Sequence, residues 1–178
     1  MRKHRKLYTP RLPVCPIRGR FLISETMVAK TEQLLASYRG VGGNHEGLVF
    51  WCGREFDDLA VLTTAIAPDC AHGPGRVMAD LPAIEAVSDA AHSHNLGVLA
   101  QVHSHPGEWI EHSEGDDSMV LMPFDGMLSI VVPHYARYGM QPLHHMGVHQ
   151  YQDGGWILVE PGSIRRALTL LPDTLDLR

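Results

Sequence analysis

Two segments of the chain carry apolar residues at helical spacing, and two more begin with residues that favour a helix start. Ser24 offers a side-chain cap to the first helix, and Pro82 suits the first turn of the second. Ser113 has the same capping ability ahead of a short third helix. The expected helices lie between Ser24 and Gly40, between Pro82 and Gly97, over residues 114–122, and from about Pro161 onward.

Short apolar and β-branched runs between turn-forming residues predict strands. The expected strands cover residues 46–53, 59–66, 98–105, 127–132, 145–151 and 155–160. The first two form a hairpin across the turn at Asp57 and Asp58, whereas residues 67–80 contain Pro, Gly and Asp and are expected to form a loop. Because helices and strands alternate without a repeat, the pattern favours one α/β domain with a mixed sheet.

Composition limits the class of protein more than it limits the fold. The chain has 178 residues, a length typical of one domain, and a net charge of −5, which does not suggest a broad nucleic-acid-binding face. Residues 1–20 are basic and proline-rich and are expected to form an extended N-terminal arm. The domain itself is expected to occupy residues 21–178.

The cysteines and the apolar runs indicate a cytoplasmic protein. Cys15, Cys52 and Cys70 stand far apart without a C-x-x-C pair, which suits a reducing compartment and argues against a zinc ribbon. The N-terminus lacks an apolar run of signal-peptide length, and no stretch has the length of a membrane helix. We therefore expect a cytoplasmic location and no membrane partner.

His103 and His105 stand two residues apart at the end of the strand expected over residues 98–105. Alternate residues of a strand point to one side of a sheet, so the two imidazoles share a face. Asp116 falls in the first turn of the next helix, and its carboxylate can turn toward the same point. Two imidazoles and one carboxylate suit a catalytic zinc ion, with one position left for water. The sequence therefore predicts one Zn²⁺ per chain.

Glu46 and Ser113 are the candidate catalytic residues. A metal-activated water needs a base that collects its proton and delivers it to a leaving amine. Glu46 opens an expected buried strand directly after the glycine-rich residues 40–44, where a carboxylate can be held beside the metal. The Ser113 hydroxyl can cap the helix or donate a hydrogen bond to an oxyanion.

The stretch HSHPGEWIEHSEGD, with NHEGLVF upstream, resembles the JAB/JAMM metalloprotease family, the catalytically competent MPN domains. The resemblance covers residues 20–160 in its order of elements. It implies an α/β sandwich like that of cytidine deaminases, with a mixed, largely antiparallel sheet flanked by helices. Position by position, His103, His105 and Asp116 match the zinc ligands. Glu46 matches the general acid/base, and Ser113 matches the oxyanion-stabilising serine.

Family members cleave isopeptide or peptide bonds at the C-terminal tails of ubiquitin or ubiquitin-like proteins. The chain looks most like the stand-alone prokaryotic JAB proteins that accompany ubiquitin-like conjugation enzymes. The resemblance thus implies a ubiquitin-like protein or its conjugates as substrate, with E1-like and E2-like enzymes of the same pathway as partners.

Several alternatives stay open on sequence. A catalytically silent MPN scaffold is one, and a zinc peptidase acting on a sulfur-carrier protein or a small peptide amide is another. A nucleobase deaminase is excluded because its P-C-x-x-C motif is absent. Asp117 adjoins Asp116, and only the spacing favours Asp116 as the ligand. His112 is expected at a solvated loop position, with a place in the cleft wall as the alternative, and His45 is expected to have a structural or rim role.

Overall fold

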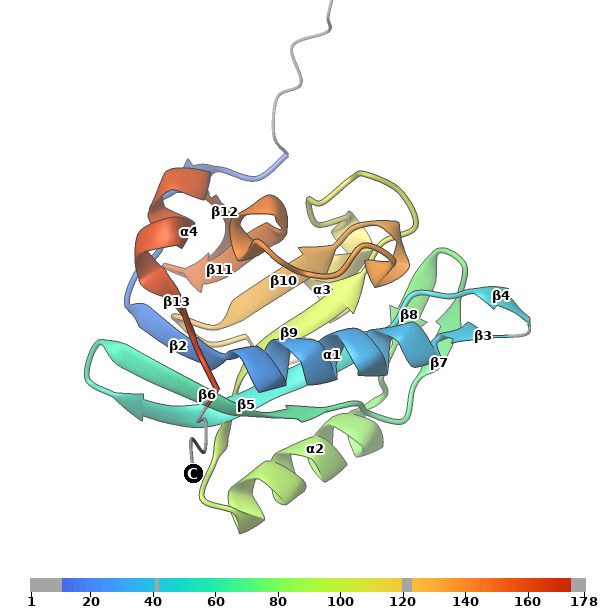
Figure 1. Cartoon of the computed structure of the whole chain (residues 1–178), viewed down its shortest axis with the longest axis horizontal. Coiled ribbons are helices and arrows are strands. Elements are labelled where there is room, and N and C mark those ends of the chain that lie inside the picture. Colours follow the sequence, from blue (N-terminus) through green and yellow to red (C-terminus); the bar gives the residue numbers. More distant parts are fainter. Residues whose placement is uncertain (1–10, 41, 120–122, 174–178) are drawn as a thin grey trace, which may run out of the picture.

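The structure, a computed structural model, describes residues 11–40, 42–119 and 123–173. A nine-stranded sheet runs through it in the order β1-β12-β11-β10-β9-β5-β6-β2-β13 (Figure 1). Its strands are β1 (Val14–Cys15), β2 (Arg20–Ser24), β5 (Leu48–Phe56), β6 (Leu59–Ile66), β9 (Gly97–Ser104), β10 (Leu128–Val132), β11 (Gly147–Gln152), β12 (Gly155–Val159) and β13 (Leu168–Leu171).

Two small hairpins and several helices complete the described part of the chain. The hairpins are β3 (Arg39–Gly40) with β4 (Gly43–Asn44), and β7 (Ala71–Gly73) with β8 (Arg76–Met78). The α-helices are α1 (Glu25–Ser37), α2 (Leu81–Ser93), α3 (Glu114–Met119) and α4 (Pro161–Ala167). Two 3-10 turns are η1 (His134–Ala136) and η2 (Leu143–His145). No helix of the described ranges is long and apolar enough to cross a membrane.

The mixed α/β sandwich expected from the sequence is confirmed. Strand β9 lies at the centre, antiparallel to β5 on one side and parallel to β10 on the other. The longest ladders, β5 with β6 and β5 with β9, are antiparallel, whereas β2 pairs in parallel with both β6 and β13. Ser24 caps α1 by accepting from the Met27 amide at 3.1 Å, and Asp80 caps α2 in the same way.

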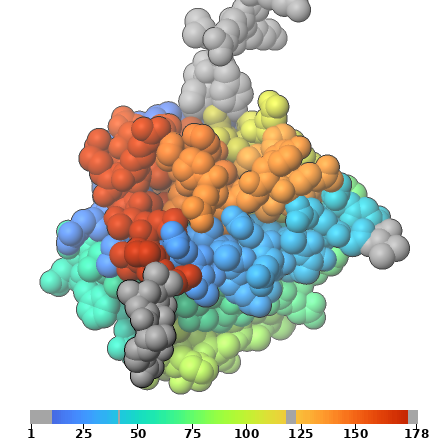
Figure 2. Space-filling model, viewed as in Figure 1, coloured from blue at the N-terminus to red at the C-terminus, as the bar shows by residue number. Residues whose placement is uncertain are grey.

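The two long helices cover opposite faces of the sheet, and this follows from the alternation of side chains along β5. Trp51 points into the core formed with α1, where its indole Nε1 donates to Thr31 Oγ1 at 2.8 Å. Phe50 points the other way and packs with Val87 of α2. Figure 2 shows α1 in blue running across the front of the molecule below the orange and red C-terminal segments.

Three segments differ from the sequence-based expectation. Residues 67–80, expected as a loop, contain the hairpin of β7 and β8. The terminal helix ends at Ala167, and the chain continues as strand β13. In the expected arm, β1 pairs with β12, while residues 1–10 lie outside the described residues. The third helix is described only to Met119, so the expected end at residue 122 also lies outside.

Candidate metal centre

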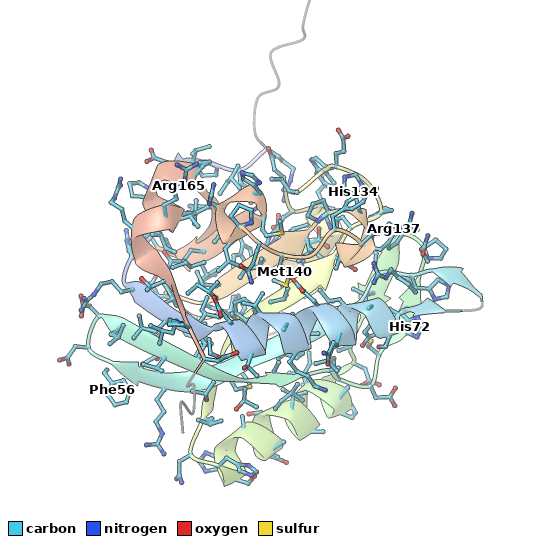
Figure 3. All side chains as sticks on the ribbon, in the orientation of Figure 1. Phe56, His72, His134, Arg137, Met140 and Arg165 are labelled. Atoms are coloured by element: carbon cyan, nitrogen blue, oxygen red, sulfur yellow. The ribbon has the colours of Figure 1, made fainter. Side chains whose placement is uncertain are left out.

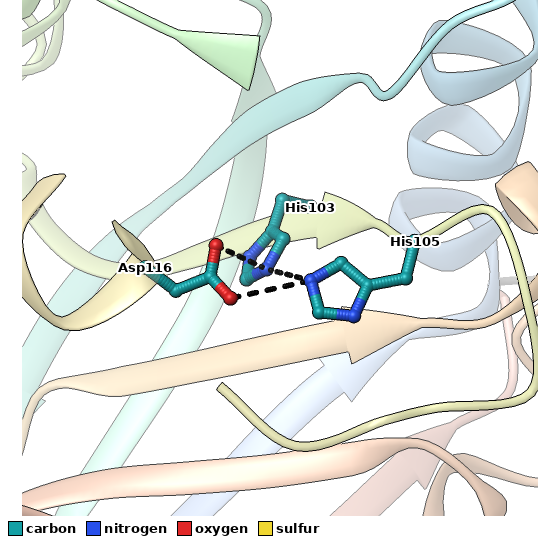
Figure 4. Close-up of side chains that lie close together, drawn as sticks. All are labelled: His103, His105 and Asp116. Carbon is teal, nitrogen blue, oxygen red and sulfur yellow. Dashed lines mark hydrogen bonds and ion pairs between the residues drawn. The ribbon is translucent and has the colours of Figure 1, made fainter. Parts of the chain in front are cut away.

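His103, His105 and Asp116 meet at one buried point at the end of β9 (Figure 4). The Nε2 atoms of the two histidines lie 3.1 Å apart. Asp116, in the first turn of α3, places its two carboxylate oxygens 3.5 Å from His103 Nε2 and 3.3 Å from His105 Nε2. One ligand atom from each residue lies within 4.8 Å of the others. The structure thus brings together the three residues that the sequence singled out.

The turn that begins α3 is built so that Asp116 faces the histidines. The Asp116 backbone amide donates to Ser113 Oγ at 3.1 Å, and the Ser113 amide donates to Asp116 Oδ2 at 2.6 Å. This reciprocal arrangement is a capping box, and it fixes the carboxylate of Asp116 at the start of the helix. Asp117 instead turns to His112 and Arg11, so the geometry favours Asp116 over its neighbour as a ligand.

His105 is oriented by the loop that follows it. Its Nδ1 lies 3.0 Å from the Trp109 carbonyl oxygen, and the indole of Trp109 stacks on the imidazole with ring centroids 5.4 Å apart. Because a carbonyl only accepts, Nδ1 carries the proton and Nε2 presents its lone pair to the site. Metal-bound histidines are commonly held in this way by a backbone carbonyl.

The electrostatics of the three residues fit a cation. Burial alone would raise the pKa of Asp116, but the imidazoles of His103 and His105 beside its carboxylate keep that pKa well below its usual range. Burial lowers the pKa of His103, so that imidazole is neutral near pH 7. Burial also acts to lower the pKa of His105, but the Asp116 carboxylate outweighs it and the net shift is upward. Two nitrogens and one ionised oxygen, all buried, are a donor set that zinc accepts.

Glu46 lies beside this centre, two residues before β5 and not within a strand, which corrects the sequence-based expectation. Its amide donates to the Gly73 carbonyl at 2.9 Å, so the β7–β8 hairpin holds its backbone. Burial raises the pKa of its carboxyl to about 7, with His105 opposing the shift and Asp116 adding to it. A carboxyl with this pKa can both accept and donate a proton near neutrality.

One groove joins the candidate catalytic residues to the metal centre. It has a volume of about 510 Å³. Its lining consists of Glu46, Gly75, Arg76, Met78, His105, Pro106, Gly107, Trp109, Ser113, Gly115 and Asp116. Ser113 therefore lines the groove and also caps α3, and its hydroxyl accepts from Asp116 while keeping a proton to donate.

Two features of the site were missed at the level of sequence. The β7–β8 hairpin supplies Arg76 and Met78 to the groove wall, although the turn signal Gly73-Pro74-Gly75 could have revealed it. His112 was expected in a solvated loop, and this was wrong: its side chain is fully buried. The His45 imidazole lies outside the ligand group, with Nδ1 2.8 Å from Nδ1 of His72 on the hairpin.

Comparison with known proteins finds a sequence relative and similar solved structures. No family model matches the chain. A relative in Sinorhizobium fredii, named "Probable metalloprotease y4jG", is 30% identical over 140 residues, which make up 76% of this chain and 86% of that protein. The solution structure of protein DSY2949 from Desulfitobacterium hafniense matches with a TM-score of 0.62 at 12% identity, covering 86% of this chain and 94% of that one.

A second solved structure, the JAB1/MPN domain protein AF2198 from Archaeoglobus fulgidus, matches at 18% identity with a TM-score of 0.47 and covers 86% of this chain and 98% of that one. The match to DSY2949 concerns the fold alone. The alignment with the sequence relative covers most of both chains, and His103, His105 and Asp116 form a buried group that could hold a metal ion. The chain therefore belongs to the same family as this probable metalloprotease, and its H-x-H-P and S-x-x-D motifs resemble those of the JAB/MPN metalloproteases.

Proposed function

We propose that the protein is a zinc-dependent isopeptidase or peptidase that hydrolyses the amide bond at the C-terminal tail of a ubiquitin-like protein. The observation that carries the proposal is the shared groove, in which the Glu46 carboxyl faces the buried group of His103, His105 and Asp116. A zinc ion held by these three residues would make a water in the groove more acidic and would polarise the substrate carbonyl.

The residues of the chain then account for the proton transfers. Glu46 takes the proton from the attacking water and delivers it to the departing lysine or α-amine, which its raised pKa suits. Ser113 donates its hydroxyl proton to the oxygen that becomes negatively charged. The Ser113 amide donates a hydrogen bond to Asp116, which keeps the Ser113 side chain close to the metal ligands.

The shape of the groove supports an extended, glycine-ended tail as the substrate. Three glycines, Gly75, Gly107 and Gly115, lie along the walls, so little side-chain volume narrows the passage. Within the described residues, strand β8 pairs with β7 alone, in a separate two-stranded sheet. A tail could add as a third strand beside this hairpin, where backbone hydrogen bonds hold a peptide without reading its sequence.

The biological setting follows from the same proposal. The substrate is a ubiquitin-like protein, as precursor or conjugate, and E1-like and E2-like enzymes of one cytoplasmic pathway are the expected partners. A sulfur-carrier protein or a small peptide amide is the alternative substrate, which the same residues would hydrolyse by the same mechanism. A silent scaffold is disfavoured because such domains lose metal ligands, and this chain keeps His103, His105 and Asp116 together.

The test uses a ubiquitin-like protein extended past its C-terminal glycine by a short peptide. Wild-type protein should release the peptide, lose this activity on treatment with a chelator, and regain it with Zn²⁺. Glu46→Gln should abolish release while metal analysis still shows one zinc per chain. Glu32→Gln is the matched control because Glu32 lies on α1, accepts from the Met140 amide (Met140 is labelled in Figure 3) and does not line the groove, so this variant should be fully active. Full activity of Glu46→Gln would refute its role as base.

A further inference from the structure

A chain of hydrogen bonds runs beneath the metal centre and joins four segments. Gln101 Nε2 donates to Ser129 Oγ at 3.0 Å, and Ser129 Oγ lies 2.8 Å from His112 Nε2. On its other side, His112 Nδ1 lies 3.0 Å from Asp117 Oδ1. Asp117 ends the chain in an ion pair with Arg11 from the N-terminal segment. The order is therefore Gln101, Ser129, His112, Asp117 and Arg11.

The chemistry of the partners fixes the direction of each bond. An ionised Asp117 can only accept, so Nδ1 of His112 carries the ring proton and Nε2 is an acceptor. The Ser129 hydroxyl accepts from Gln101 and donates to His112 Nε2. All of the donors thus point toward Asp117, and bonds aligned in this way strengthen one another.

The ends of this chain flank the metal ligands. Gln101 precedes His103 by two residues on β9 and therefore shares its face of the sheet. Asp117 directly follows Asp116 in α3. The histidine ligands and the carboxylate ligand belong to these two separate segments, and the hydrogen-bonded chain is what connects their neighbours across the buried interior.

His112 stands at the middle of this series of hydrogen bonds, and its side chain is fully buried. Its ring stacks on His149 with centroids 3.8 Å apart, and its backbone amide donates to His149 Nε2 at 3.3 Å. Its ring also lies 5.9 Å, centroid to centroid, from that of His103. Both His112 and Ser129 are fully buried, so loss of either partner leaves a polar atom without water to replace it.

Arg11 holds the same loop from outside. Its backbone amide donates to Glu111 Oε2 at 3.1 Å, and its guanidinium donates to the carbonyls of His112 and Ser113, each at 3.3 Å. The guanidinium also pairs with Asp117. The loop that leads into α3 is thus clamped between Arg11 on the surface and Ser129 in the core.

We propose that His112 is a positioning residue for the metal centre, and that with Asp117 and Ser129 it sets the place of Asp116 relative to His103 and His105. It acts through these neighbours and contacts neither metal nor substrate. Correct separation of the two ligand segments determines the metal affinity, because three ligands bind tightly only when all reach the ion together. This role presupposes the proposed metal site but is independent of the substrate.

The experiment measures zinc affinity by competition with a chelator, using the full chain. Ser129→Ala removes two of these hydrogen bonds, those to Gln101 and to His112, and His112→Phe removes the two made by the imidazole. Asp117→Asn removes the negative charge that holds His112 and Arg11. Each variant should bind zinc about 10- to 100-fold more weakly than wild type. His112→Asn places an amide N–H where Nδ1 stands, restores the bond to Asp117, and should bind more tightly than His112→Phe.

Two further measurements separate positioning from general loss of stability. Thr31→Val is the control. Thr31 is an equally buried polar residue, but it accepts a hydrogen bond from Trp51 in the core beneath α1, so the variant should keep wild-type zinc affinity. The absorption bands of bound Co²⁺, which report coordination geometry, should change in Asp117→Asn and not in Thr31→Val. If His112→Phe fails to fold, the Ser129 and Asp117 variants carry the test.

The outcomes are distinct. Unchanged zinc affinity and Co²⁺ bands in Ser129→Ala and Asp117→Asn, beside normal binding by wild type, would overturn the positioning role alone. Failure of wild type to bind zinc would overturn the metal site and this role together. Normal zinc binding without peptide release would overturn only the proposed substrate.

Discussion

Ser104 and Gly47 exchange two hydrogen bonds: the Gly47 amide donates to Ser104 Oγ at 3.0 Å, and the Ser104 amide donates to the Gly47 carbonyl at 3.1 Å. Ser104 stands between the two histidine ligands, and Gly47 follows Glu46. The pair therefore ties the segment of the candidate base directly to the segment of the candidate ligands. The Ser104 side chain is completely buried, so no water can replace this link.

Ser104→Ala should lower kcat while leaving zinc bound. The change leaves the Gly47 amide without a partner and frees the Glu46 segment to move, and a small displacement of a catalytic group costs about 10- to 100-fold in rate. Single-turnover cleavage and metal analysis on one preparation measure both quantities. Ser163→Ala, which removes another buried hydroxyl far from the groove, is the control and should be active. Loss of zinc in Ser104→Ala would point to a different role.

The stability of the metal-free protein should depend on the protonation of Glu46. Burial raises its pKa from the ordinary 4.5 to about 7, so the folded state holds the proton more tightly than the unfolded state. This contribution to stability is complete below pH 4.5 and is lost as the pH rises through 7. Glu46→Gln carries no such proton and should gain up to about 3 kcal/mol relative to wild type between pH 5 and 8.5.

Urea denaturation in the presence of a chelator gives the free energies of unfolding at each pH. The comparison with Glu46→Gln removes the contribution of every other titrating group that both proteins share. Added zinc should abolish the difference, because a nearby cation favours the ionised carboxylate. A difference that is flat with pH in the metal-free proteins would contradict the raised pKa.

Tyr135→Phe should weaken substrate binding, seen as a higher KM, without slowing the chemical step, seen as kcat. Tyr135 lies in the left-handed turn η1, where its amide donates to the His105 carbonyl at 2.7 Å and its hydroxyl donates to the Pro74 carbonyl at 2.6 Å. It thus connects the ligand loop to the hairpin that walls the groove. Figure 3 shows His134 of this turn and His72 of the hairpin at the same end of the molecule.

Loss of one such hydrogen bond corresponds to about a two- to tenfold change, which we expect in KM with kcat and zinc content unaltered. Steady-state kinetics with the extended ubiquitin-like substrate would measure it. Tyr138→Phe is a matched control because Tyr138 is 76% exposed and its hydroxyl can remain in water. An equal rise of KM in both variants would rule out the hairpin contact as the cause.

Gly147→Ala should unfold the domain more readily. A Cβ at this position of β11 would lie 1.6 Å from the Ile110 carbonyl oxygen, a backbone atom that cannot move without shifting the ligand loop. We expect a loss of about 3 kcal/mol or more in the free energy of unfolding. Gly162→Ala, with nothing within 4 Å of the added methyl, should be neutral in the same thermal melt.

The local parts of the site could be predicted from the sequence because they depend on short spacings. His103 lies in β9 and His105 directly follows it, so the alternation of extended backbone places both on one side of the sheet, and Ser113 and Asp116 meet within one turn of helix. The cap of α1 at Ser24 is equally local. Each needs only the geometry of a single element, which side-chain pattern reports directly.

The parts that were missed depend on partners far along the chain. The hydrogen-bond partners of His112 lie 5, 17 and 37 residues further along the chain, and no local sequence pattern indicates a buried polar network. The largely apolar residues 168–171 fit a helix as well as a strand. They form a strand because they pair with β2. Arg11 reaches residues about a hundred positions away. Such choices are made by tertiary contacts.

The two strands β2 and β13 also bear on how the protein is made. They pair residue for residue from Phe21 with Leu168 to Ser24 with Leu171, and the Thr26 amide donates to Asp173, 147 residues further along. During synthesis β2 therefore keeps one edge unpaired until residues 168–171 have left the ribosome. An unpaired edge invites association with other chains, so stalled or shortened translation products should be the aggregation-prone form of this protein.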